Sequence, residues 1–108
     1  MYITAAGFET RLTEYLFIET NYLPVPQVAY THLLHLLDNG DHTYLRIKDG
    51  NAEEYVRVKN VCDRLVLFRG EEGTTVKAFP CGSLVTFAMT KSGVEAQVCQ
   101  MTEEDCNG

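Results

Sequence analysis

The chain of 108 residues has no tryptophan, three prolines and no long apolar run. A helix that spans a bilayer needs roughly 20 consecutive apolar residues, so no membrane partner is expected. The N-terminal stretch MYITAAGFETRLTEY also lacks a basic segment followed by an apolar one. That order is the mark of a secretory signal, and the sequence therefore predicts a protein that is made and used in a cytoplasm.

Positive charge is scarce. Nine Lys and Arg residues stand against fifteen Asp and Glu, which gives a net charge of −6 at pH 7. The basic residues are scattered along the sequence, whereas binding to nucleic acid needs clustered Lys and Arg. We therefore expect a soluble acidic protein with no nucleic-acid partner.

Cysteine pairs with the spacing of a zinc ribbon are absent. The four cysteines are Cys62, Cys81, Cys99 and Cys106, and no two of them form a CxxC motif. Without an export signal, disulfides are not expected either. The sequence predicts reduced thiols packed as small apolar groups, with Cys106 exposed in a polar tail.

Candidates for chemistry are few. One group of histidines and aspartates could ligate a metal if its HxxH motif lay on one helical face. The more ordinary interpretation is that these histidines are solvated or lie at an interface. The group consists of His32, His35, His42, Asp38 and Asp41. Cys81 could act as a nucleophile with His42 as its base, but no spacing pre-organises the two. The sequence therefore predicts no metal, no cofactor and no enzymatic activity.

The remaining pattern is typical of short strands. Strands are predicted, from alternation and from clusters of β-branched and aromatic residues, over residues 12–20, 43–48, 53–61, 62–70, 83–90 and 94–101. Turn signals separate them, notably Asp-Gly-Asn at 49–51. Residues 28–37 are ambiguous, with an extended segment favoured over a short helix. The whole chain, 1–108, is predicted to be a single, mainly all-β domain, a small antiparallel barrel or sandwich with a short helix possible in the N-terminal third and a frayed tail at 102–108.

The segment RGEEGTT, residues 69–75, raises the question of a phosphate loop. Such a loop needs Lys beside Ser or Thr after its second glycine and a helix behind it, and this sequence has neither. Its two acidic residues would also repel a phosphate. Gly70 and Gly73 instead permit backbone shapes closed to other residues, so the segment is interpreted as a structural connection between two strands.

Residues 53–90 resemble a small β-module of tailed-bacteriophage virion proteins that carries the motif RGxEGTT between strands. The match covers these residues well and residues 12–90 more loosely. The matching positions are Glu54, Val56, Val58, Leu65, Leu67, Arg69, Gly70, Glu72, Gly73, Thr74, Thr75, Ala78, Phe79, Gly82, Val85 and Thr90.

The resemblance implies a structural virion protein, a tail, baseplate or fibre-attachment component that acts by assembling with other virion proteins. Such parts form trimers or rings, are made in the host cytoplasm and end in the virion tail. A neck component, or a module at the virion surface that binds host receptor or saccharide, is the alternative.

Two sets of residues are singled out for this role. Glu54 and Arg69 are predicted to form a bidentate pair that fixes the strand register and the glycine-rich turn; the alternative is that both are solvated. The structural motif is completed by Gly70, Glu72, Gly73, Thr74, Thr75 and Gly82. The candidate interface aromatics are Tyr2, Phe8, Tyr15, Tyr22 and Tyr30. Deleting residues 1–11 is expected to weaken assembly and to leave folding intact.

Overall fold

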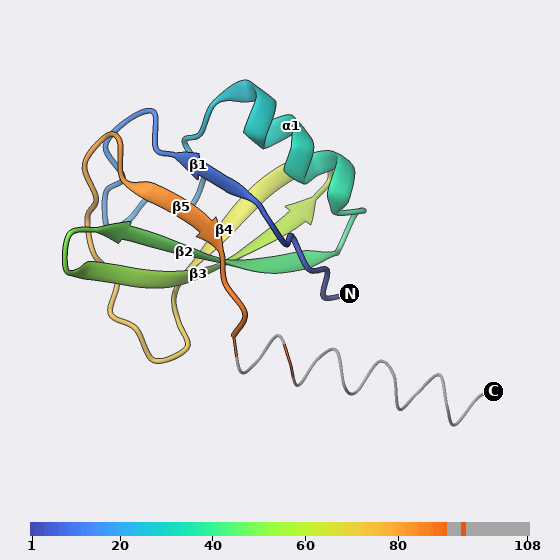
Figure 1. Cartoon of the computed structure of the whole chain (residues 1–108). Coiled ribbons are helices and arrows are strands. Elements are labelled where there is room, and N and C mark those ends of the chain that lie inside the picture. Colours follow the sequence, from blue (N-terminus) through green and yellow to red (C-terminus); the bar gives the residue numbers. More distant parts are fainter. Residues whose placement is uncertain (91–93, 95–108) are drawn as a thin grey trace.

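The computed structural model describes residues 1–90 and Val94, and these form one open, strongly twisted antiparallel sheet with a single helix beside it (Figure 1). The elements in chain order are β1 (Glu9–Arg11), α1 (Gln27–Leu36), β2 (His42–Asp49), β3 (Ala52–Val61), β4 (Arg64–Glu71) and β5 (Leu84–Phe87). The order across the sheet is β1-β5-β2-β3-β4. The predicted mainly β class is confirmed, and within the described residues the sheet does not close into a barrel.

Of the two central hairpins, the first follows directly from the sequence, whereas the second turns at Cys62 and Asp63, which were predicted to begin the strand at 62–70. Asp49 pairs with Ala52, which leaves Gly50 and Asn51 as a two-residue loop. Val61 pairs with Arg64 across Cys62 and Asp63, whose φ angles of 52° and 65° are those of a type I′ turn. Because side chains alternate across a strand, β3 buries every second residue, as predicted.

The prediction that favoured an extended segment at residues 28–37 is wrong. They belong almost entirely to α1, which follows Pro26 and ends before Leu37. Leu33 and Leu37 are four residues apart and lie on one helical face, and both are completely buried. The apolar run is too short to show the helical period clearly. Packing of one apolar face against the sheet stabilises the helical conformation.

The strand predicted at residues 12–20 is also wrong. The first strand is β1, and residues 12–20 follow it as an irregular segment that touches the rest of the fold at single points. One such point is the bridge between Leu16 and Phe79. The predicted strand at 94–101 and the tail at 102–108 lie outside the described residues, apart from Val94.

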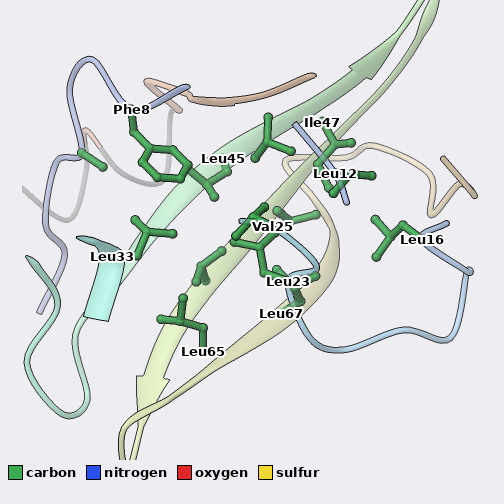
Figure 2. Packing of buried hydrophobic residues seen from close by; sticks show 14 of the residues in the cluster. Phe8, Leu12, Leu16, Leu23, Val25, Leu33, Leu45, Ile47, Leu65 and Leu67 are labelled. Carbon is green, nitrogen blue, oxygen red and sulfur yellow. The ribbon is translucent and has the colours of Figure 1, made fainter. Parts of the chain in front are cut away.

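The core lies between the inner face of the sheet and the segments that cover it, which are α1, the N-terminal residues and the loop after β1 (Figure 2). Its fully buried side chains include Leu16, Leu33, Leu37, Leu45, Ile47, Val56, Val58, Phe79 and Val85. Loop residues therefore contribute to the core as much as the strands do, and the loops are held in place by what they bury.

Two aromatic residues of the N-terminus belong to this core, which corrects the prediction that Tyr2 and Phe8 are interface residues. Tyr2 and Phe8 are 4% and 8% exposed, and Phe8 stacks on the ring of His32 at a centroid distance of 6.3 Å. Tyr30 is half-buried against the core, where its hydroxyl accepts a hydrogen bond from the amide of Leu65. Deletion of residues 1–11 would remove β1 and two core aromatics, so folding itself depends on this segment.

Cys62 and Cys81 are free thiols and both are exposed. The prediction that they are packed as apolar groups is therefore wrong for these two. Cys99 and Cys106 lie outside the described residues.

Among the residues that the structure describes, no helix is long and apolar enough to cross a membrane.

Candidate functional site

A bulge in β4 creates the most elaborate polar site of the described structure. Tyr55 pairs with Glu71, but two residues further along β3, Arg57 pairs with Phe68, so β4 contains one residue more than its partner there. The extra residue falls at Arg69–Gly70, where Gly70 has a φ of 63°. Arg69 follows the buried residues Leu65 and Leu67 at alternate positions and lies on the same inner face of β4.

Arg69 meets Glu54, and the two form the bidentate pair that the sequence predicts. Arg69 Nε donates to Glu54 Oε2 at 2.8 Å, and Nη2 donates to Oε1 at 2.9 Å. Glu54 is completely buried and the Arg69 side chain is 9% exposed. Two charges removed from water at this depth are costly unless every lone pair and proton is satisfied.

Backbone amides and carbonyls provide the remaining hydrogen-bond partners of the two side chains. Glu54 accepts two more hydrogen bonds, from the amides of Gly70 at 2.9 Å and Lys77 at 2.8 Å. Arg69 Nη1 donates to the carbonyls of Phe17 at 2.8 Å and Thr20 at 3.1 Å, and Nη2 donates to that of Lys77. A guanidinium has five N–H donors, and all five are used. We call this set of hydrogen bonds the Glu54–Arg69 network.

The network determines the charge state of Glu54. Burial is the largest influence and raises the pKa of this carboxyl, but the hydrogen bonds from Arg69, Lys77 and Gly70, with the charge of Arg69, together outweigh burial. The resulting pKa of Glu54 lies below its ordinary value of 4.5. The carboxyl is therefore ionised at neutral pH and acts as a fixed acceptor, which suits a structural role better than proton transfer.

Stability should accordingly fall in acid. With a folded pKa below the unfolded one, Glu54 contributes stability that is fully present above pH 4.5 and is lost as the pH falls through the folded value. We expect the melting temperature of the wild type to drop as the pH falls below 4.5. Glu54→Gln should start lower and show a shallower acid slope in the same thermal melts, and parallel slopes for the two proteins would contradict this assignment.

The RGEEGTT segment forms the end of β4 and the beginning of the connection to β5, as predicted. Gly70, Glu72 and Gly73 all have positive φ angles, of 63°, 57° and 75°. Thr74 closes the turn, because its hydroxyl accepts from the Tyr55 amide at 3.1 Å and donates to the Glu71 carbonyl at 2.7 Å. Thr75 is exposed, and Gly82, with a φ of 91°, turns the chain into β5.

Substitution of the two turn glycines should separate backbone strain from crowding. A Cβ on Gly70 would meet Val76 Cγ2 at 3.1 Å and the Thr74 carbonyl at 3.2 Å, whereas one on Gly73 would meet nothing within 4 Å. Gly73→Ala should therefore cost about 1 kcal/mol of unfolding free energy for its positive φ alone. Gly70→Ala should cost at least about 1 kcal/mol more, for the added contacts. Equal losses in urea titrations would show that the contact with Val76 relaxes freely.

An exposed apolar surface lies directly beside the network. The loop after β1 makes a tight turn in which the Thr20 amide donates to the Phe17 carbonyl at 3.1 Å and the Phe17 amide donates to Thr20 Oγ1 at 3.1 Å. Large side chains at and around this turn remain open to solvent; they are Tyr15, Phe17, Ile18 and Tyr22, at 46%, 53%, 59% and 50% exposure. We call these four residues the apolar turn.

The apolar turn is firmly held although it lies in a loop. Arg69 binds both ends of the turn through the carbonyls of Phe17 and Thr20. Leu16, between two exposed aromatics, is completely buried, and the amide of Leu67 on β4 donates to the Asn21 carbonyl at 2.8 Å. The rings of Tyr15 and Phe17 lie 4.7 Å apart. The buried ion pair thus serves as the anchor of a surface feature.

Of the five predicted interface aromatics, the structure leaves Tyr15 and Tyr22 exposed in the apolar turn and buries Tyr2 and Phe8. The sequence reasoning missed Phe17 and Ile18, because the apolar run LFI was interpreted as part of a strand. A signal was available: acidic Glu14 and Glu19 flank the run, and a short apolar segment between charges suits an exposed turn as well as a strand.

The residues considered for chemistry do not form a site. His42 lies at the first residue of β2, packed against Tyr2 and Tyr44, whereas Cys81 precedes β5 near the opposite end of β2, where Leu84 pairs with Lys48. Six residues of strand separate those ends by roughly 20 Å. Within the described part of the chain, no group of three His, Cys, Asp or Glu side chains could hold a metal ion.

None of the family models, curated proteins or solved structures with which the chain was compared matches it.

Proposed function

We propose that this chain is a structural virion subunit of a tailed bacteriophage, a tail, baseplate or fibre-attachment component that acts through protein–protein assembly. The observation that carries the assembly role is the apolar turn, in which four large side chains are each about half exposed. Aromatic side chains are enriched at protein interfaces, where they act as anchors. The virion assignment rests on the resemblance of residues 53–90.

The way in which the turn is held supports an interface. A buried ion pair is weak evidence for stability, since apolar residues of similar volume often serve as well. Here the pair binds the two carbonyls that define the turn. A binding surface that is already ordered loses less conformational entropy when a partner binds.

The mass of the purified protein, measured by light scattering on a size-exclusion column with reductant present, tests the assembly role. We expect a discrete oligomer, a trimer or a larger ring, that dissociates on dilution. A monomer of 12.2 kDa at every concentration would contradict self-assembly. The virion assignment has its own test: an antibody raised against the protein should label the tails of the phage that encodes it, and unlabelled particles would contradict it.

Recognition of a host saccharide at the virion surface is the second candidate, and the paired rings of Tyr15 and Phe17 favour it. Exposed aromatic faces can stack on sugar rings, but a sugar site also needs convergent polar groups, and the neighbouring Ile18 is apolar. A glycan array probed with labelled protein would separate the two, because saccharide binding predicts discrete positive spots that Tyr15→Ala abolishes.

A further inference from the structure

The outer face of the sheet concentrates the positive charge of a chain that is acidic as a whole. Strand register places on this face six of the nine basic residues, Arg11, Arg46, Lys48, Arg57, Lys59 and Arg64. It carries three carboxylates, Glu9, Glu53 and Glu71. Six cations and three carboxylates give the face a charge of +3, so the rest of the chain, whose total is −6, carries −9.

The outer face also has a hollow and an exposed aromatic side chain. A shallow hollow of about 330 Å³ is lined by three cations, Arg11, Arg46 and Lys48, and by one carboxylate, Asp49, together with parts of the turns before β3 and β5. Elsewhere on this face, the guanidinium of Arg57 lies 4.2 Å above the ring of Phe68, which is 37% exposed. A partner that fits this face would combine negative charge with aromatic or apolar side chains.

The chain itself contains such a partner. Glu14 precedes the four residues of the apolar turn and Glu19 lies among them, and both acids are exposed. Glu14 also accepts a hydrogen bond from the Tyr22 hydroxyl at 2.8 Å. The inward-pointing Arg69 holds this turn on the inner side of the sheet, away from the outer face of the same molecule. The turn of one copy is therefore free to meet the outer face of another.

We propose that the outer face of the sheet receives the acidic apolar turn, Glu14–Tyr22, of a second copy of this chain. The proposal deepens the assembly role and rests on it. Because the two surfaces differ, the contact is heterologous, and repetition of such a contact produces a ring when its rotation closes. Nucleic acid is the less favoured partner, since the charge of −9 elsewhere on the chain would oppose its approach.

Charge exchange tests the pairing. Arg46→Glu/Lys48→Glu reverses two cations of the face, and Glu14→Lys/Glu19→Lys reverses both acids of the turn. Each double variant should weaken self-association about tenfold or more, measured as mass against concentration by light scattering, because like charges then face each other. The variant with all four changes should recover the wild-type oligomer. Wild-type association should also weaken when NaCl is raised from about 50 mM to 500 mM.

Each result supports or overturns the proposal. Thermal melts first verify that all variants are folded. If reversal of the face leaves the mass unchanged while Phe17→Asp/Ile18→Asp abolishes the oligomer, the turn docks elsewhere: the further inference fails and the assembly role survives. A four-fold variant that stays dissociated would also overturn the pairing. A wild type that is monomeric at every concentration would overturn this pairing and self-assembly together.

Nucleic acid is distinguished by a separate probe. Fluorescein-labelled oligothymidylate should show no binding to the wild type by fluorescence anisotropy. Binding that Arg46→Glu/Lys48→Glu removes, with the oligomer unaffected, would replace the second copy with single-stranded nucleic acid as the partner of this face.

Discussion

Arg69→Ala should lower the free energy of unfolding by about 3–5 kcal/mol, the range expected when one partner of a buried ion pair is removed. The substitution leaves the completely buried Glu54 without its counter-charge and removes the donors to the carbonyls of Phe17 and Thr20. Urea titration followed by circular dichroism measures the loss. Arg46→Ala is the matched control, because Arg46 is 37% exposed and its nearest carboxylate oxygen is 4.0 Å away, so it should cost under about 1 kcal/mol.

A variant that lacks both charges separates the cost of an unpaired charge from the loss of the hydrogen bonds. Glu54→Leu/Arg69→Leu should be less destabilised than Arg69→Ala, since no unpaired charge remains. It should stay below the wild type, because the amides of Gly70 and Lys77 lose their acceptor. A wild-type melting temperature for Arg69→Ala would show that the pair contributes nothing and would contradict the anchor role assigned to the network.

Replacing Phe8 and Phe17 by alanine should affect two different properties, the stability of the fold and self-association. Phe8 is 8% exposed and Phe17 is 53% exposed. Phe8→Ala should destabilise the fold by about 3–5 kcal/mol, as removal of a core aromatic does. Phe17→Ala should change stability by at most about 0.5 kcal/mol and should instead weaken self-association. Urea titration gives the first quantity, and light scattering over a range of concentrations gives the second.

The two measurements must separate for the account to hold. Loss of stability in Phe17→Ala equal to that in Phe8→Ala would mean that the apolar turn is part of the core in solution. Conversely, a stable Phe8→Ala with a weakened oligomer would restore the N-terminus as an assembly surface, which its burial now contradicts.

The hairpin of β2 and β3 could be predicted because the local signals there agree. Strict alternation in β3 and the Asp-Gly-Asn turn at 49–51 fix the register of β2 and β3 from neighbouring residues alone. Cys62 and Asp63, which were predicted as the start of a strand, instead form the second turn. The Glu54–Arg69 pair was also predictable, since it joins adjacent strands. Its backbone partners in the turn at Phe17–Thr20 were not, because they are some 50 residues distant in the sequence and only the folded loop brings them near.

The N-terminal third was harder to predict for a physical reason. The helix α1 has only ten residues, and helices this short depend on tertiary packing more than on local preference. The loop that follows β1 has no period, so nothing in its sequence separates Leu16, which is buried, from Phe17, which is exposed. The candidate site lies partly in this region, and its exposed residues were therefore only half identified.

The role of the apolar turn in self-assembly is decided by the solution mass of Phe17→Asp/Ile18→Asp, measured beside the wild type. Val28→Asp is the control, since Val28 is 84% exposed on α1 and lies outside the apolar turn. We expect an oligomer for the wild type and for Val28→Asp, and a folded 12.2 kDa monomer for the turn variant. The same oligomer in all three proteins would show that the apolar turn does not mediate self-assembly.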